Sequence, residues 1–163
     1  MASGNSLCSF FPADNEPPAA NYATLDTRNN HNVLDFDGST NESAVFTGVM
    51  PQHYAGGGVT VYIHYSMTSA TTDDVDWDVA FERIGDQQLD IDADSFAAVQ
   101  SVDGTVVPGT SGFVDVVSIP FTNGAQMDSV VAGELFRLKI TRDAVSDTDA
   151  TDAELHTVEI RET

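Results

Sequence analysis

Hydrophobic and polar residues alternate through the middle of the chain, on both sides of a polar break at residues 69–74. Before the break, the apolar positions two residues apart are Val59, Val61, Ile63, Tyr65 and Met67. After it, the same spacing recurs at Val75, Trp77, Val79 and Phe81. A repeat of two turns one set of side chains toward a core and the other toward water, as in antiparallel sheets. This stretch therefore predicts two strands joined by a turn.

Similar alternation, bounded by turn residues, indicates further strands at residues 22–26, 33–36, 42–50, 113–121, 135–142 and 155–162. In the last of these, the pattern assigns His156, Val158 and Ile160 to one face. Residues 85–104 show no clear period and are expected to be irregular. Residues 127–132 predict a short helical segment capped by Asp128.

Seven to nine short strands separated by turns are typical of an all-β fold. We predict a single-domain antiparallel β-sandwich, jelly-roll-like, over residues 21–163. An immunoglobulin-like sandwich is the alternative, although Cys8 is the one cysteine and antibody domains have a pair. Residues 1–20 hold three of the six prolines. They predict an extended N-terminal arm, which is either a solvated terminus or a segment that orders on a partner through Phe10 and Phe11.

The charge of the chain is strongly negative, because 26 acidic residues face six basic ones and the formal net charge is -20. Such a surface repels phosphate backbones and anionic lipids, so neither nucleic acid nor a membrane is an expected partner. Solubility is the simplest role of this charge. No apolar run approaches the ~20 residues of a bilayer span. No signal peptide is recognisable, so synthesis in a cytoplasm is expected.

The motifs that carry catalytic chemistry are weak. Ser111 lies in Gly-Thr-Ser-Gly, which lacks the Gly-x-Ser-x-Gly spacing of a nucleophile elbow. The four histidines are His31, His53, His64 and His156, and no two of them have the i, i+4 spacing of a zinc protease. No pair of carboxylates stands out from the many others, so an enzyme is not expected.

Calcium is the one cofactor that the acidic residues favour, because it binds oxygen ligands. Asp90, Asp92 and Asp94 have the opening spacing of an EF-hand loop, but serine stands at the positions where that loop needs glycine and glutamate. An irregular calcium site stays open at these three residues, or at Asp147, Asp149 and Asp152. The alternative is a solvated acidic surface that binds no cofactor.

Exposed aromatic residues on a β-sandwich either stack on sugars or become buried in a protein interface. The candidate partner-binding residues are Phe10, Phe11, Pro12, Tyr22 and Tyr54. For each of them, ordinary packing within the fold is the alternative.

A further pattern is formed by five segments, at residues 49–51, 54–58, 61–67, 76–83 and 133–143. The fourth of them reads Asp-Trp-Asp-Val-Ala-Phe-Glu-Arg. Together they resemble a family of small β proteins encoded among the virion genes of tailed bacteriophages. The resemblance implies a structural virion protein, most simply a capsid decoration (cement) protein. Such a protein binds the major capsid protein between capsomers, often as a homotrimer. A carbohydrate- or receptor-binding β-sandwich module of a phage tail or fibre is the alternative.

Overall fold

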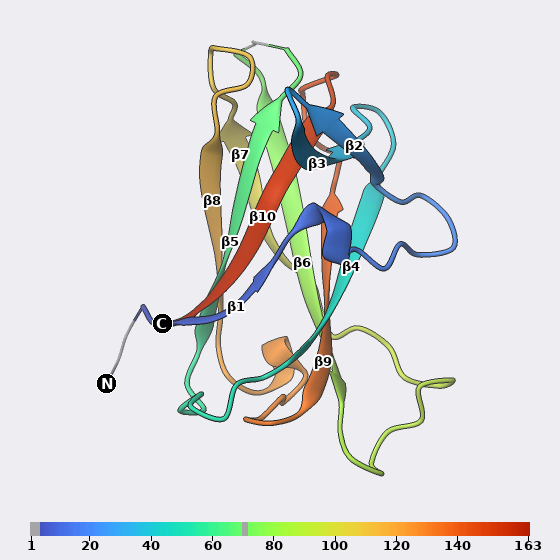
Figure 1. The fold of residues 1–163 in the computed structure, drawn as a ribbon, viewed down its shortest axis with the longest axis vertical. Helices are drawn as coiled ribbons and strands as arrows, with labels where there is room; N and C mark the ends of the chain where they lie inside the picture. Colours follow the sequence, from blue (N-terminus) through green and yellow to red (C-terminus); the bar gives the residue numbers. More distant parts are fainter. Residues whose placement is uncertain (1–3, 70–71) are drawn as a thin grey trace.

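The strands of the protein form two sheets packed face to face in the computed structural model, which describes residues 4–69 and 72–163 (Figure 1). The strands are β1 (Ser6–Phe10), β2 (Thr24–Arg28), β3 (His31–Phe36), β4 (Glu42–Val49), β5 (Val59–Met67), β6 (Asp74–Ile84), β7 (Gln100–Val106), β8 (Asp115–Phe121), β9 (Leu135–Arg142) and β10 (Ala153–Glu162). Two short 3-10 turns are η1 (Pro12–Asp14) and η2 (Ala125–Met127).

Both sheets are antiparallel. The first, called sheet A, has the order β2-β3-β10-β5-β8, with β1 also paired to β10. The second, sheet B, has the order β4-β9-β6-β7. The predicted all-β, jelly-roll-like sandwich is therefore confirmed.

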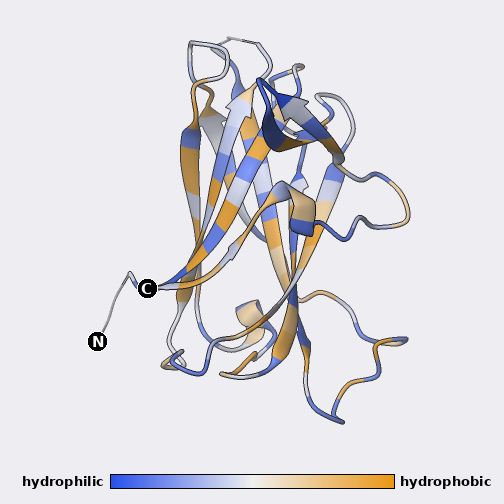
Figure 2. Ribbon diagram, viewed as in Figure 1, coloured by the Kyte–Doolittle hydropathy of each residue, from blue (hydrophilic) through white to orange (hydrophobic). Residues whose placement is uncertain are grey.

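The core lies between the sheets, where the alternating apolar residues of both meet. Val61 and Ile63 on β5 and Phe81 on β6 are fully buried, as the period of two predicts. Figure 2 shows the alternation as orange and blue bands along the strands. The Trp77 ring meets the rings of Phe36 and Tyr65 at steep angles, with centroids 5.2 and 5.4 Å away. These edge contacts join sheet A to sheet B.

Two sequence-based expectations about the connecting segments differ from the structure. The end of the segment 85–104, expected to be irregular, belongs to the strand β7 (Gln100–Val106), whose pattern is weak because it lies at the edge of sheet B and buries little. The helical segment expected at 127–132 is wrong, because Asp128 and Ser129 have positive φ angles of 53° and 60° that end η2. Part of the turn predicted at 69–74, residues 70–71, lies outside the described residues.

The N-terminal arm predicted for residues 1–20 is also wrong for the described part, and residues 1–3 lie outside it. β1 pairs with the second half of β10. Phe10 is buried and stacks on Phe46 with ring centroids 5.3 Å apart. A Cβ on Gly48 would lie 2.9 Å from Phe10 Cζ, so the absent side chain makes room for this ring. The segment therefore belongs to the sandwich, and no helix of the described residues is long and apolar enough to cross a bilayer.

Candidate functional site

The tip of the β2–β3 hairpin is not paired with β10 and lies over the outer face of sheet A (Figure 1). Its turn residues Asn29 and Asn30 have φ angles of 48° and 65°, as in the two-residue turns that suit the twist of a hairpin. β3 pairs with β10 only as far as Leu34, and β1 pairs with the rest of β10. The tip of the hairpin is thereby free to cross the sheet instead of continuing along it.

Arg28 fixes the tip of the hairpin to the end of β5 and to the segment that precedes β8. Its Nη1 forms an ion pair with the Glu154 carboxylate and donates to the Met67 carbonyl at 2.9 Å. Its Nη2 donates to Ser111 Oγ at 2.8 Å. Gly112, with a φ of +77°, lies against the guanidinium, and a Cβ there would come 2.9 Å from Nη2. The glycine therefore allows the close approach that holds the hairpin down.

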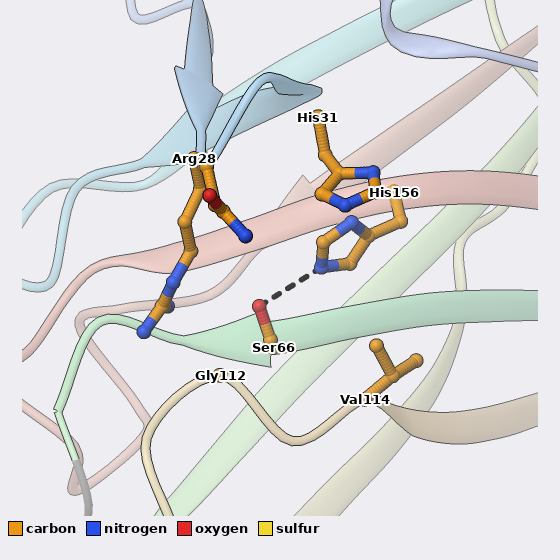
Figure 3. Close-up of a pocket in the computed structure, with 7 residues that line it drawn as sticks. Arg28, His31, Ser66, Gly112, Val114 and His156 are labelled. Atoms are coloured by element: carbon orange, nitrogen blue, oxygen red, sulfur yellow. Dashed lines mark hydrogen bonds between the residues drawn. The ribbon is translucent and has the colours of Figure 1, made fainter.

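Two adjoining hollows lie under and beside this hairpin, and both are lined by His31 and His156. The first has a volume of about 340 Å³ and is lined by Arg28, Asn29, His31, Ser66, Gly112, Val114 and His156 (Figure 3). The second has a volume of about 420 Å³ and is lined by Phe11, Pro12, Ala13, Asn30, His31, Asn32 and His156. Each volume lies within the ~300–1,000 Å³ typical of ligand sites. We call the two together the histidine groove.

A β-bulge places His156 in the groove. Leu155 pairs with Tyr65 and Thr157 pairs with His64, so two steps along β10 match one step along β5. The additional residue, His156, turns outward and lies 2.9 Å from Ser66 Oγ through its Nε2 (Figure 3). The expected shared face of His156, Val158 and Ile160 is therefore wrong, because a bulge changes the face that follows it.

The hydrogen bonds around Ser66 indicate which nitrogen of His156 carries the proton. Ser66 Oγ–H donates to the Glu154 carboxylate at 3.1 Å, which uses its single proton. The 2.9 Å contact with His156 then requires Nε2–H to donate to Ser66 Oγ. In the neutral ring this leaves Nδ1 as an acceptor.

The pKa of His156 lies below its usual value. Burial is the main cause, and His31, Arg28 and His64 lower the pKa further, while Glu154 opposes them. A positive charge on the imidazole is therefore disfavoured when the groove is empty.

The serine and histidine of the groove do not form a catalytic relay. Ser66 is fully buried, and the carboxylate of Glu154 accepts from the serine instead of orienting the imidazole. A Ser–His–acid triad needs the acid on the second nitrogen of the histidine. Ser111 is likewise occupied, because it accepts from Arg28 and lies 2.9 Å from the Thr68 carbonyl. The arrangement suits binding by fixed donors and acceptors.

The structure brings two of the five candidate partner-binding residues into the groove. Phe11 and Pro12 line the second hollow, and the Phe11 side chain is 57% exposed. Phe10 lies in the core, and Tyr54 is buried, with its hydroxyl on the Gly57 carbonyl. Tyr22 is exposed beside β4 but lies outside the groove.

The acidic segments show no metal centre in the part of the chain that the structure describes, where no three His, Cys, Asp or Glu residues are grouped to hold one. In the first calcium candidate, Asp90 Oδ1 accepts from the backbone of Asp92 and Asp94 Oδ1 from that of Ser95. Two residues of the second candidate, Asp147 and Asp149, contact the fully buried guanidinium of Arg142, whereas Asp152 Oδ1 accepts from the Gly38 backbone. Arg142 Nε lies 2.8 Å from Asp147 Oδ2, and the Nη atoms of Arg142 donate to the carbonyls of Phe36, Asp149 and Thr151.

The residues missed by sequence reasoning are Arg28, His31, Ser66 and His156. The turn-forming residues at 28–32 were the one available signal, because they predict a reversal of the chain. The crossing of the hairpin over β10 and β5 depends on long-range contacts that no local pattern contains.

No protein-family model and no curated protein matches the sequence. Solved structures do match in fold, at low identity. A family 35 carbohydrate-binding module from an environmental isolate has a TM-score of 0.56 and 11% identity, over 94% of this chain and 92% of that one. The C-terminal family 6 carbohydrate-binding module of LamC, a marine laminarinase from Zobellia galactanivorans, has a TM-score of 0.55 and 10% identity. This match covers 97% of this chain and 100% of that one.

The xylan-binding CBM22-2 domain of Xyn10C from Paenibacillus barcinonensis has a TM-score of 0.52 and 11% identity, and the match covers 92% of each chain. At such identities these likenesses show the fold alone. The sandwich of this protein is thus of the kind found in carbohydrate-binding modules.

Proposed function

We propose that this protein is a non-catalytic carbohydrate-binding module that holds part of a glycan in the histidine groove. The observation that carries the proposal is the groove itself, in which polar side chains from separate strands lie between the exposed Phe11 ring and Arg28. The sandwich fold, shared with modules from three carbohydrate-binding families, supports it.

The groove matches the two kinds of surface that a sugar presents. The apolar C–H faces of a sugar ring pack on aromatic and aliphatic side chains, and Phe11 and Pro12 offer such a surface in the second hollow. The hydroxyl groups need donors and acceptors, which Asn29, His31 and His156 supply. Because Arg28 holds the hairpin in place, the site is formed before the ligand arrives and little ordering entropy opposes binding.

A role in a virion stays a prediction, based on the resemblance to phage proteins. Binding to the major capsid protein, a homotrimeric state and a location in the particle are all part of it. The groove favours the form of that prediction in which the chain is a glycan- or receptor-binding module of a tail or fibre, because a cement protein has no need of a polar hollow.

Binding to polysaccharides tests the proposal. We expect the protein to be retarded in native affinity gels that contain at least one of a panel of neutral and acidic plant and algal polysaccharides. Phe11→Ala and His31→Ala should each weaken binding by about tenfold or more, since each removes one contact of ~1.5 kcal/mol. The matched controls are Ile91→Ala and His53→Ala, which remove exposed residues of the same kinds outside the groove.

If both groove variants bind with the affinity of the wild type, the ligand binds outside the histidine groove. Absence of binding to every polymer of the panel would count against the proposed function as a whole. Far-UV circular dichroism of the four variants would verify that each is folded.

A further inference from the structure

We propose that the histidine groove is selective for anionic sugars, with the carboxylate or sulfate group held between His31, His156 and the guanidinium edge of Arg28, and that binding is accompanied by proton uptake. This inference rests on the proposed function and names the class of glycan that the same site binds. It follows from the kinds of charge that face the groove.

The groove brings together basic side chains in a protein that has few of them. The chain has six Lys and Arg residues and four histidines against 26 acidic residues, and the first hollow is lined by Arg28, His31 and His156. No carboxylate of the described residues lines it. Figure 3 shows the two imidazoles next to each other, with the guanidinium beyond them. A third imidazole, His64, is near enough on β5 to act on His156. A neutral sugar has no need of such a cluster.

Arg28 keeps donor groups for a ligand. Its hydrogen bonds to Met67, Glu154 and Ser111 take three of its five N–H groups. Among the described residues no partner is found for Nε–H or for the second Nη2–H. Its side chain is about one-third exposed, at 32%. Glu154 balances its charge, so the net positive charge of the groove depends on the histidines.

Protonation of His156 gives the groove a second directed donor. Its Nε2–H is held by Ser66, so an added proton goes to Nδ1 and turns an acceptor into a donor. Burial and the neighbouring cations disfavour this proton in the empty groove, with Glu154 as the opposing charge on β10. A bound anion reverses the balance, because charge-assisted hydrogen bonds favour the imidazolium form. The affinity for an anion must then rise as the pH falls.

The other groups that face this region do not cancel the effect. On β3, Asp35 lies opposite Glu154, and its pKa is raised to about 6, so its negative charge diminishes as the pH falls toward 6. The segment before β8 contributes Gly112 and Val114, which do not titrate. The negative charge of the rest of the surface acts at longer range and is screened beyond ~8 Å at physiological ionic strength. Local attraction therefore prevails when a sugar carries its anionic group into the groove.

The test compares polymers that differ only in charge. Isothermal titration in 0.15 M NaCl (about physiological ionic strength) would use polygalacturonate against its fully methyl-esterified form, and a sulfated galactan against its desulfated form. We expect the charged member of at least one pair to bind about tenfold tighter than its neutral partner at pH 6. Uptake of one proton makes this affinity fall by up to about tenfold per pH unit as the pH rises between the pKa of His156 in the empty groove and its higher pKa in the complex. The carboxylate and sulfate arms identify which anion is preferred.

His156→Gln should keep the hydrogen bond to Ser66 through its amide nitrogen while it removes the titrating Nδ1. Its affinity for the charged polymer should change less between pH 6 and pH 8 than that of the wild type. His31→Gln provides a second variant on an exposed position that does not endanger folding. His53→Gln, outside the groove, should behave as the wild type does.

Equal binding of charged and neutral polymers, or a flat pH profile for the wild type, would overturn the inference and leave the proposed function standing. If no polymer binds but inorganic sulfate shifts the imidazole NMR signals of His31 and His156, the anion site stands and the carbohydrate function fails. If neither polymers nor sulfate have an effect, both are wrong.

Discussion

Asp35 is a carboxylate whose negative charge its surroundings disfavour. It lies on β3 opposite Glu154 of β10, and its Oδ1 is buried without a hydrogen-bond partner among the described residues. Burial is the largest cause that raises its pKa, to about 6, and the charges of Asp152 and Glu154 add to it. The folded protein therefore binds a proton at Asp35 more tightly than the unfolded chain, in which an aspartate has a pKa of about 3.9. The ionised form is a source of instability at neutral pH.

The sign of the pH dependence follows from this difference. As the pH falls from 7.5 to 5, Asp35 takes up a proton in the folded state first, and its contribution to the free energy of unfolding becomes more favourable. Asp35→Asn should therefore be more stable than the wild type at pH 7.5, with the advantage shrinking toward pH 5. Urea unfolding of the variant and the wild type at the two pH values measures this difference in the free energy of unfolding. Asp37→Asn is the matched control: hydrogen bonds from Ser39 lower the pKa of Asp37, so this variant should be less stable than the wild type, by a similar amount at both pH values.

At the scale of the element, the bulge in β10 and the overhanging hairpin make the groove. The strands β4, β5, β6 and β9 follow their sequence patterns, because burial on one face of a sheet imposes a period of two. The bulge breaks that period after Leu155, and no sequence pattern around His156 predicts the bulge. The position of the hairpin depends on Arg28 reaching Met67 and Ser111, which lie 39 and 83 residues away along the chain. Fold class was therefore predictable from local pattern, and the site was not.

The strand β1 and the residue after it give adjacent phenylalanines with opposite roles. Phe10 is 6% exposed and packs on Phe46 and Phe136 across the core, whereas Phe11 points into the groove at 57% exposure. Phe10→Ala should lower the free energy of unfolding by about 3–5 kcal/mol, the usual loss for a buried ring. Phe11→Ala should change it by less than ~0.5 kcal/mol.

Urea unfolding of the two variants and affinity gels with the same proteins separate the roles. Phe10→Ala should bind normally while it stays folded, and Phe11→Ala should bind poorly at full stability. If Phe10→Ala were as stable as the wild type, β1 would act as the detachable arm that composition alone predicts, and the packing described for it would be wrong.

Across the whole molecule, the distribution of charge is uneven. All five arginines form ion pairs with a carboxylate in the part of the chain that the structure describes, and only five of the 26 acidic residues are matched in this way. The single lysine, Lys139, lies over the Phe96 ring. Repulsion among the remaining carboxylates opposes the compact state. Salt has two effects here, because it screens this repulsion and also weakens the exposed ion pairs.

Repulsion should prevail, because the unmatched carboxylates outnumber the pairs and exposed pairs contribute only ~0–1 kcal/mol each. The buried pair of Arg142 with Asp147 is little affected by salt. We expect the melting temperature to rise by about 3 °C or more between 0.05 and 1 M NaCl, which corresponds to ~1 kcal/mol for a chain of this size. Differential scanning calorimetry measures this rise. The triple variant Asp86→Asn, Asp92→Asn, Asp103→Asn removes three exposed carboxylates that take part in none of the five ion pairs. It should melt higher than the wild type at low salt and respond less to NaCl, whereas a wild-type melting temperature that falls with salt would show that the ion pairs dominate.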